Sequence, residues 1–276
     1  MNPEISVILP TYNGARFIKQ SIDSIVAQTF PNWELIIVND CSTDQTLELI
    51  EPYAKSDARI KIISNKTNKK LPASLNIGFN QAKGRFLTWT SDDNYYAPDA
   101  FKKMLKVFED NSSIDFVYAD MCVVDEDGRV LKYKLKHNEI SELYHGCCIG
   151  ACFLYNRRLY EDFGGYNEEL FCAEDYEYWM RLWINNARFY HLKDCLYAYR
   201  NNSLSLSATR AAEVQEKTFK LKLMYWDKVP VGRFKKCLAL YKPYKKTHNP
   251  AMLTQIYELH PVLGRLIYLI KLKGIL

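Results

Sequence analysis

Apolar and polar residues alternate in blocks along the first hundred or so residues of the chain. Short apolar runs that end in polar turns predict buried strands, and these cover residues 5–9, 33–38, 60–64 and 85–90. Apolar residues three or four positions apart predict helices over residues 15–28, 43–53, 71–82 and 98–109. Strands that alternate with helices in this way predict an α/β fold with a parallel sheet covered on both faces.

Polar turns follow three of these strands. They cover residues 11–13, 39–42 and 91–94. Ligands of open α/β sheets bind beyond the carboxyl ends of the strands, where all three turns are expected to lie. The sequence therefore predicts one binding site at one edge of the sheet.

Two adjacent carboxylates, Asp92 and Asp93, come directly after the strand at residues 85–90. At the carboxyl end of a buried strand they would form a compact oxygen site suited to Mg²⁺ or Mn²⁺. A metal of this kind most often holds a diphosphate. The alternative is a turn of two Asp and Asn94 that caps the helix starting near Pro98.

The second half of the chain is less regular. It predicts a strand at 115–119, a hairpin around Gly128, a small-residue loop entering a strand at 146–155, and a helix at 174–186. We divide the chain into residues 1–98 and 99–210, expected to be two halves of one domain, and a helical basic extension over 211–276.

Four motifs, in order, resemble a known family. Residues 6–13 (SVILPTYN), 38–44 (VNDCSTD), 90–93 (TSDD) and 173–175 (AED) match family 2 glycosyltransferases of the GT-A fold in order and spacing. The resemblance extends from about residue 4 to 207. It implies a Rossmann-like, mixed but mainly parallel sheet flanked by helices, and transfer of a sugar from a nucleotide diphosphate with inversion. It also implies that residues 1–98 are the nucleotide-sugar-binding half of the domain and residues 99–210 the acceptor-binding half.

The resemblance also assigns the nucleotide site. Asp40 would accept a hydrogen bond from a base N–H, a charge-assisted contact that favours uracil. The alternative for Asp40 is an N-cap of the helix at 43–53. The other residues assigned to the nucleotide are Pro10, Thr11, Tyr12, Asn13, Lys70, Leu71 and, at the ribose, Asp92.

The chemical step needs a metal site and a base. By the resemblance Asp93 coordinates Mn²⁺ or Mg²⁺, which would act as a Lewis acid on the departing diphosphate. Asp175 would be the base that deprotonates the acceptor hydroxyl, with Glu174 positioning the acceptor. The alternative for both acids is capping of the helix that begins there.

The acceptor side rests on fewer residues. Gly150 would allow close approach of the acceptor, or tight packing, and Trp179 would stack on a sugar ring, or belong to the core. Asn202 stands where relatives often carry His in a Tyr-Arg-x-His pattern. The absence of a Gln-x-x-Arg-Trp motif favours transfer of one sugar per encounter.

Charge is distributed unevenly along the chain. The net charge is +5, yet residues 230–276 carry nine Lys or Arg against one acid, Glu258. Phosphate-rich partners such as a membrane surface, or simple solvation, would account for this basic end. An apolar stripe of Leu263, Leu266, Ile267 and Ile270 predicts contact of residues 258–276 with the inner membrane, or a packed helix or oligomer contact.

Localisation follows from cysteine usage and the N-terminus. Eight scattered cysteines and the absence of a signal-like start predict a cytoplasmic protein, peripheral on the membrane if its end binds there. The expected partners are a nucleotide-diphosphate sugar, with UDP favoured, and a glycan or lipid-linked acceptor of bacterial surface polysaccharide synthesis. No nucleic acid is expected.

Other classes fit less well. Pyrophosphorylases and dinucleotide-binding dehydrogenases carry a glycine-rich loop after the first strand, where this chain has only Gly14. A catalytically inactive relative that binds sugar nucleotides or serves as a scaffold remains the alternative.

Overall fold

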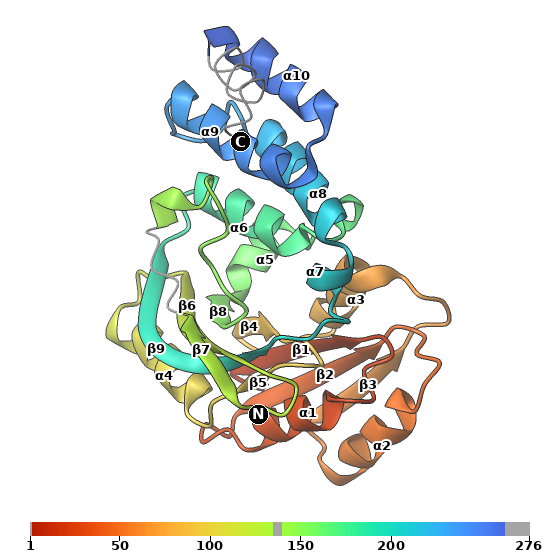
Figure 1. Ribbon diagram of the computed structural model, residues 1–276. Helices are drawn as coiled ribbons and strands as arrows, with labels where there is room; N and C mark the ends of the chain where they lie inside the picture. Colours follow the sequence, from red (N-terminus) through yellow and green to blue (C-terminus); the bar gives the residue numbers. More distant parts are fainter. Residues whose placement is uncertain (1, 135–139, 263–276) are drawn as a thin grey trace.

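The computed structural model describes residues 2–134 and 140–262. In this part of the chain, nine strands form one sheet through the centre of the molecule (Figure 1). The strands are β1 (Ile5–Thr11), β2 (Trp33–Asn39), β3 (Ile60–Ser64), β4 (Phe86–Trp89), β5 (Tyr95–Tyr96), β6 (Phe116–Val124), β7 (Val130–Lys134), β8 (Phe153–Asn156) and β9 (Phe189–Arg200). The helices are α1 (Ile18–Val26), α2 (Thr46–Ser56), α3 (Lys70–Phe79), α4 (Ala100–Asp110), α5 (Arg157–Phe163), α6 (Glu174–Ile184), α7 (Leu206–Thr209), α8 (Ala211–Met224), α9 (Arg233–Thr247) and α10 (Pro250–Leu259).

The first half of the sheet is parallel. Strands β3, β2, β1 and β4 are neighbours in that order, and Ile8 of β1 pairs with Ile36 of β2 and Trp89 of β4. Both faces of β1 and β2 are covered, which is why their sequences are continuous apolar runs rather than alternating ones. The predicted parallel arrangement of these strands is confirmed.

The second half of the sheet mixes directions. Strand β8 pairs antiparallel with both β4 and β6, whereas β6 and β9 pair in parallel. Strand β7 folds back on β6 as the hairpin predicted around Gly128, whose φ of 86° lies in the region that favours glycine. The sheet is therefore mixed, and it is parallel among β1 to β4, in agreement with the predicted mixed and mainly parallel sheet.

Helices cover the two faces of the sheet. On one face Val7 and Leu9 pack with residues of α1 and α4, among them Ile22 and Phe101. On the other face Ile8 packs with residues of α3 and α6. The alternation of β1 side chains between the two cores fixes the strand in its register, because a shift by one residue would exchange the faces.

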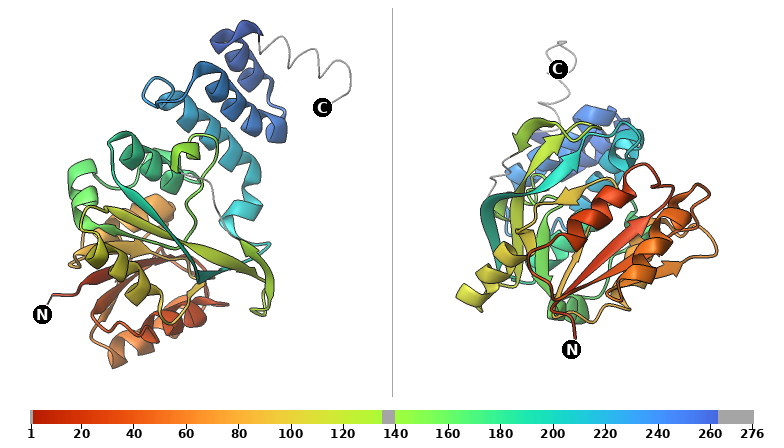
Figure 2. Two further views of the ribbon diagram at one scale, coloured as in Figure 1. Left: turned by 90° about the vertical axis from the view of Figure 1, so that its left-hand side faces the viewer. Right: turned by 90° about the horizontal axis from the view of Figure 1, so that it is seen from below.

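Helices α8, α9 and α10 form an extension that stands beyond α5 and α6 (Figure 2). They share a small core of their own that includes Phe219, Leu240 and Ile256. One of the contacts that bind the extension to the rest of the protein is made by Tyr225, whose hydroxyl donates to Glu177 Oε1 at 2.6 Å. Because Glu177 also binds Arg181, the joint between the two parts is a buried polar network.

Some predictions needed correction or fall outside the described residues. The strand predicted at 115–119 continues to Val124, and β9 was not predicted at all. The apolar stripe of Leu263, Leu266, Ile267 and Ile270 lies outside the described residues. In the described ranges, no helix has the length and hydropathy needed to cross a membrane.

Candidate active site

The loops that follow β1 and β2 are bound to each other. Asn13 is at φ 56°, a left-handed conformation that Asn tolerates. Its backbone N–H donates to Ser42 Oγ at 3.0 Å, and its side-chain oxygen accepts from the Thr43 N–H at 2.8 Å. These contacts hold the loops after β1 and β2 together at the edge of the sheet where the polar turns were expected to meet.

Asp92, after β4, contacts the first loop directly. The Thr11 hydroxyl donates to Asp92 Oδ2 at 2.5 Å, across 81 positions of sequence. Burial and the neighbouring Asp93 carboxylate raise the pKa of Asp92 to about 7, although the Thr11 hydrogen bond opposes the shift. The structure thus brings the turns after β1 and β4 together, as the sequence predicted.

Gly14 makes this contact sterically feasible. A Cβ atom at Gly14 would collide with Asp92 Oδ2 and lie 2.5 Å from Thr11 Oγ1. Sequence reasoning used Gly14 only to exclude glycine-rich loops. Its role follows from the close approach of Asp92, a residue far away in the sequence, so the spacing of residues along the chain does not predict it.

Arg200 holds the loop that carries Asp93 by hydrogen bonds to the backbone of Asp93 and the side chain of Asn94. Arg200, at the end of β9, donates from its side-chain Nε to the Asp93 carbonyl oxygen at 2.9 Å. Its backbone N–H donates to Asn94 Oδ1 at 2.7 Å. The guanidinium stacks 4.3 Å from the centre of the Phe17 ring. Arg200 is only 2% exposed, so it acts as a buried clamp on the Asp93 loop. In the sequence, Arg200 is the arginine of the Tyr-Arg-x-His pattern, and that pattern alone does not predict a clamp on the Asp93 loop.

The Asp93 carboxylate faces Asn202. The Asn202 side-chain amide lies 3.5 Å from Asp93 Oδ2. Burial raises the pKa of Asp93, and the amide opposes that shift. The residue that replaces the family's His therefore stays beside the carboxylate assigned to the metal.

These residues fit a metal that arrives with a diphosphate. Among residues 2–134 and 140–262, no three His, Cys, Asp or Glu side chains form a cage for an ion. Mg²⁺ is usually bound by one or two carboxylates together with substrate phosphates, and Mn²⁺ prefers the same oxygen ligands. Asp93 and the adjacent Asp92 are the one or two carboxylates that such a site requires from the protein.

Asp40 organises the next loop. Its Oδ1 accepts from Asn65 Nδ2 at 2.7 Å and from the Lys69 N–H at 2.8 Å, and its Oδ2 accepts from the Lys70 N–H at 2.8 Å. A carboxylate oxygen can accept two hydrogen bonds, so Oδ2 retains one acceptor position. Asp40 does not cap α2, because the Thr46 N–H donates to Asp44 instead.

The other residues assigned to the nucleotide lie on the same edge. Tyr12 is 51% exposed, whereas Pro10 and Thr11 are buried in β1. Lys70 begins α3 and places its ammonium group 5.4 Å from the centre of the Phe171 ring, in the loop before α6. Leu71 packs against the core on the α3 face of the sheet.

Glu174 and Asp175 form the first turn of α6. Glu174 is buried, and its Oε2 has no hydrogen-bond partner in the described part of the chain. Burial, reinforced by the Asp175 carboxylate, raises the pKa of Glu174. Asp175 accepts a hydrogen bond from the Tyr176 N–H at 2.6 Å and lines a cavity.

Tyr199 connects the two acidic sites. Burial raises the pKa of its hydroxyl, the Ser207 side chain opposes the shift, and the carboxylates of Asp93 and Asp175 raise it further. Because the Tyr199 hydroxyl interacts electrostatically with both carboxylates, Asp93 and Asp175 lie in the same region of the molecule. Through Asp92 and Thr11, that region is continuous with Asp40, whose N–H donates to the Thr11 carbonyl.

Two residues assigned to the acceptor lie in packed surroundings. Trp179 is 1% exposed and meets Phe116 and Phe153 edge-on, each at 4.7 Å between ring centres. Its indole offers no face to a sugar, which favours the core interpretation. A Cβ at Gly150 would lie 2.8 Å from Met121 Cε, which favours the packing interpretation there.

The fold and sequence of the chain match known glycosyltransferases. The sequence pattern of Glycosyl transferase family 2 matches residues 6–164. EpsE of Bacillus subtilis (strain 168), a relative named as a glycosyltransferase, is 31% identical over 278 residues, covering 95% of this chain and 96% of EpsE. TuaG of the same strain, named for teichuronic acid biosynthesis, is 29% identical over 76% of this chain and 85% of TuaG.

Solved structures share the fold. S. aureus TarS 1-349 in complex with UDP-GlcNAc has a TM-score of 0.68 at 23% identity, covering 87% of this chain and 70% of that one. The mannosyltransferase PcManGT from Pyrobaculum calidifontis, in complex with GDP-Man and Mn²⁺, has a TM-score of 0.68 at 19% identity, covering 94% and 74%. The fold is thus that of the GT-A glycosyltransferases. The chain itself belongs to Glycosyl transferase family 2.

Proposed function

We propose that the protein transfers a sugar from a UDP-sugar to a hydroxyl group of a glycan or lipid-linked acceptor, with inversion at the anomeric carbon. The observation that carries this proposal is the hydrogen bond between Thr11 and Asp92 beside Asp93, with Asp175 close enough to act electrostatically on the same Tyr199 hydroxyl as Asp93. A diphosphate site and a base on the far side of the sugar are the two parts that inverting transfer requires.

Asp40 and Tyr12 would recognise the base. The free acceptor position on Asp40 Oδ2 suits the N–H of uracil, and the exposed Tyr12 ring offers a face for stacking. Asp93 would hold Mn²⁺ or Mg²⁺ with Asn202 alongside. When bound, the metal would neutralise charge on the diphosphate leaving group.

In the transfer step, Asp175 takes the proton of the acceptor hydroxyl. The acceptor oxygen then forms a bond to the anomeric carbon while the bond from that carbon to the diphosphate oxygen breaks, and UDP keeps the electron pair. Asp175 lies at the amino end of α6, where the helix dipole stabilises its negative charge. Buried Glu174 beside it would position the acceptor through its unpartnered oxygen.

The names of relatives support a role in bacterial surface polysaccharide synthesis, since TuaG is named for teichuronic acid biosynthesis. UDP and GDP-Man in the structural neighbours support a nucleotide-sugar donor. On this proposal the enzyme works at the cytoplasmic face of the membrane, where lipid-linked acceptors would be available to it.

A thermal-shift panel of UDP-, GDP-, dTDP- and CMP-sugars, with and without Mn²⁺, tests the proposal. A ligand that binds only the folded state raises the melting temperature. We expect a UDP-sugar with Mn²⁺ to give the largest rise, and Asp93→Asn to abolish the effect of Mn²⁺. A protein that no sugar nucleotide stabilises, or that GDP-sugars stabilise best, would contradict the proposed donor.

A further inference from the structure

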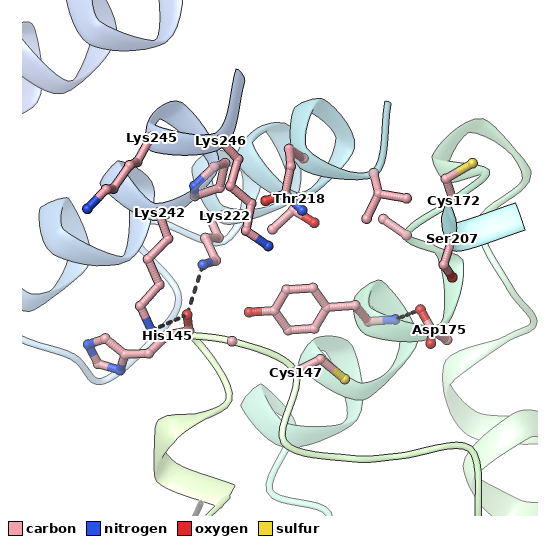
Figure 3. Close-up of a pocket in the computed structure, with 16 residues that line it drawn as sticks. His145, Cys147, Cys172, Asp175, Ser207, Thr218, Lys222, Lys242, Lys245 and Lys246 are labelled. Atoms are coloured by element: carbon pink, nitrogen blue, oxygen red, sulfur yellow. Dashed lines mark hydrogen bonds between the residues drawn. The ribbon is translucent and has the colours of Figure 1, made fainter. Parts of the chain in front are cut away.

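A cavity of about 500 Å³ lies between the N-terminus of α6 and the helices of the extension. Figure 3 shows Asp175 with Ser207 and Cys172 at one end, and Lys242, Lys245 and Lys246 toward the other. The two ends therefore differ in charge. Asp175 is the acidic residue that lines the described cavity, while four of the lining residues are lysines.

The positive charges of Lys222 and Lys242 are paired with carbonyl oxygens rather than with carboxylates. Lys222 donates to the carbonyl oxygens of His145 and Ala239 at 3.2 and 3.0 Å, and Lys242 donates to the same His145 oxygen at 3.2 Å. Within residues 2–134 and 140–262, no carboxylate lies within salt-bridge distance of any of the four ammonium groups. A cavity wall of unneutralised cations attracts anions.

One of these lysines is buried. Lys222 is 1% exposed, and burial, together with the nearby Lys242, lowers its pKa to about 7. A buried ammonium group is destabilised unless an anion compensates it. An anion in the cavity would favour the charged form of Lys222. The charged ammonium group would in turn stabilise the bound anion.

We propose that this cavity is the acceptor site, and that it takes an acceptor whose hydroxyl meets Asp175 while a phosphate or diphosphate group of the same molecule lies against Lys242, Lys245 and Lys246. The inference rests on the proposed function, because it uses Asp175 as the base. It adds the chemical class of the acceptor, which is a sugar or polyol bearing a phosphate. Lysine ammonium groups bind phosphate as point charges from several directions.

The three exposed lysines allow a test that leaves the fold intact. Lys242, Lys245 and Lys246 are all exposed, so the triple substitution to Ala removes charge without opening the core. Lys222 is retained because its side chain is buried. Lys220→Ala is the matched control, since Lys220 is exposed on α8 but does not line the cavity.

The experiment is calorimetric titration of the full chain, first with UDP and Mg²⁺, and then with inorganic pyrophosphate while UDP saturates the donor site. We expect every variant to bind UDP alike, and the triple variant to bind pyrophosphate at least tenfold more weakly than the wild type and Lys220→Ala. Pyrophosphate affinity that does not depend on the three lysines, or no pyrophosphate binding by the wild type, would overturn the inference.

Two further arms identify the source of the phosphate. One uses a soluble sugar 1-phosphate, and the other uses phosphatidylcholine vesicles with and without a prenyl phosphate. Lysine-dependent binding in the first arm indicates a soluble acceptor, and in the second arm a lipid-linked one. Failure to bind UDP would contradict the proposed function, whereas normal UDP binding without lysine-dependent phosphate binding would contradict this inference alone.

Discussion

The Thr11 hydroxyl donates a 2.5 Å hydrogen bond to Asp92 Oδ2 and so joins the ends of β1 and β4. The two strands are hydrogen-bonded neighbours in the sheet, and their carboxyl ends meet at the same edge. Asp92 is half-buried there beside Asp93, so the hydroxyl is one of the few groups that stabilise its ionised form. This contact connects the proposed base pocket to the proposed diphosphate site.

Thr11→Val should weaken donor binding, because Asp92 loses a charge-assisted hydrogen bond while the shape of residue 11 is preserved. The loss of such a bond is worth about 1.5–3 kcal/mol. We expect the Kd of the UDP-sugar to rise by about tenfold or more, measured by calorimetry. Thr11→Ser keeps the hydroxyl and should bind nearly as the wild type, and equal weakening by both variants would exclude this explanation.

Gly14→Ala should disrupt the same contact sterically. The added methyl group would collide with Asp92 and approach Thr11 to 2.5 Å, so one of them must move. Overpacking of this kind costs about 1–3 kcal/mol in the free energy of unfolding, and donor binding should weaken as well. Gly232→Ala is the control, because its new methyl group would meet no atom within 4 Å. Equal urea-unfolding midpoints for both variants would contradict the prediction.

Arg200→Lys should loosen the loop that carries Asp93. The guanidinium donates to the carbonyl oxygens of Asp93, Asp125 and Glu126, and one ammonium group cannot reproduce that fork. We expect a loss of about 3 kcal/mol in the free energy of unfolding and weaker Mn²⁺-dependent donor binding. The exposed Arg129→Lys should change neither, and an Arg200→Lys protein of wild-type stability would rule out the clamp.

Glu174 should make stability fall as the pH rises. Burial raises its pKa in the folded protein from 4.5 to about 8, so between these values the folded state holds a proton that the unfolded state has released. The stabilisation is complete below about pH 4.5 and is lost as the pH rises through about 8.

Between pH 6 and 9 the wild type should therefore lose about 2–3 kcal/mol that Glu174→Gln does not lose. Melting temperatures measured across this range check the difference, and the exposed Glu161→Gln serves as the control. Parallel pH profiles for wild type and Glu174→Gln would show that residue 174 does not titrate in this way.

The parallel half of the fold was predictable because its strands are buried on both faces. Residues such as Val7 and Ile8 point to opposite cores, so β1 reads as one apolar run and its polar turn follows at once. The turns after β1, β2 and β4 must then share an edge. Strand β9 was not predicted because its first half, from Phe189 to Cys195, has no fully buried residue and carries charged residues.

Features that depend on packing between distant elements were not predictable. Gly14 matters only because Asp92 approaches it, and Arg200 only because its side chain reaches three carbonyl groups in two loops. The lysines of α9 read in the sequence as part of a basic tail suited to a membrane or to solvent. Their place on a cavity wall shared with Asp175 depends on how α9 packs over α6.

The proposed transfer depends most on Asp175 as the base opposite the proposed diphosphate site. The measurement is release of UDP from the UDP-sugar that stabilises the protein best, compared between the wild type, Asp175→Asn and the exposed control Asp162→Asn, with UDP affinity measured on the same samples. We predict that Asp175→Asn slows release by about 10²–10⁴-fold, the usual contribution of a general base, while its UDP affinity stays within about twofold of the wild type. Near-normal release by Asp175→Asn would contradict the account.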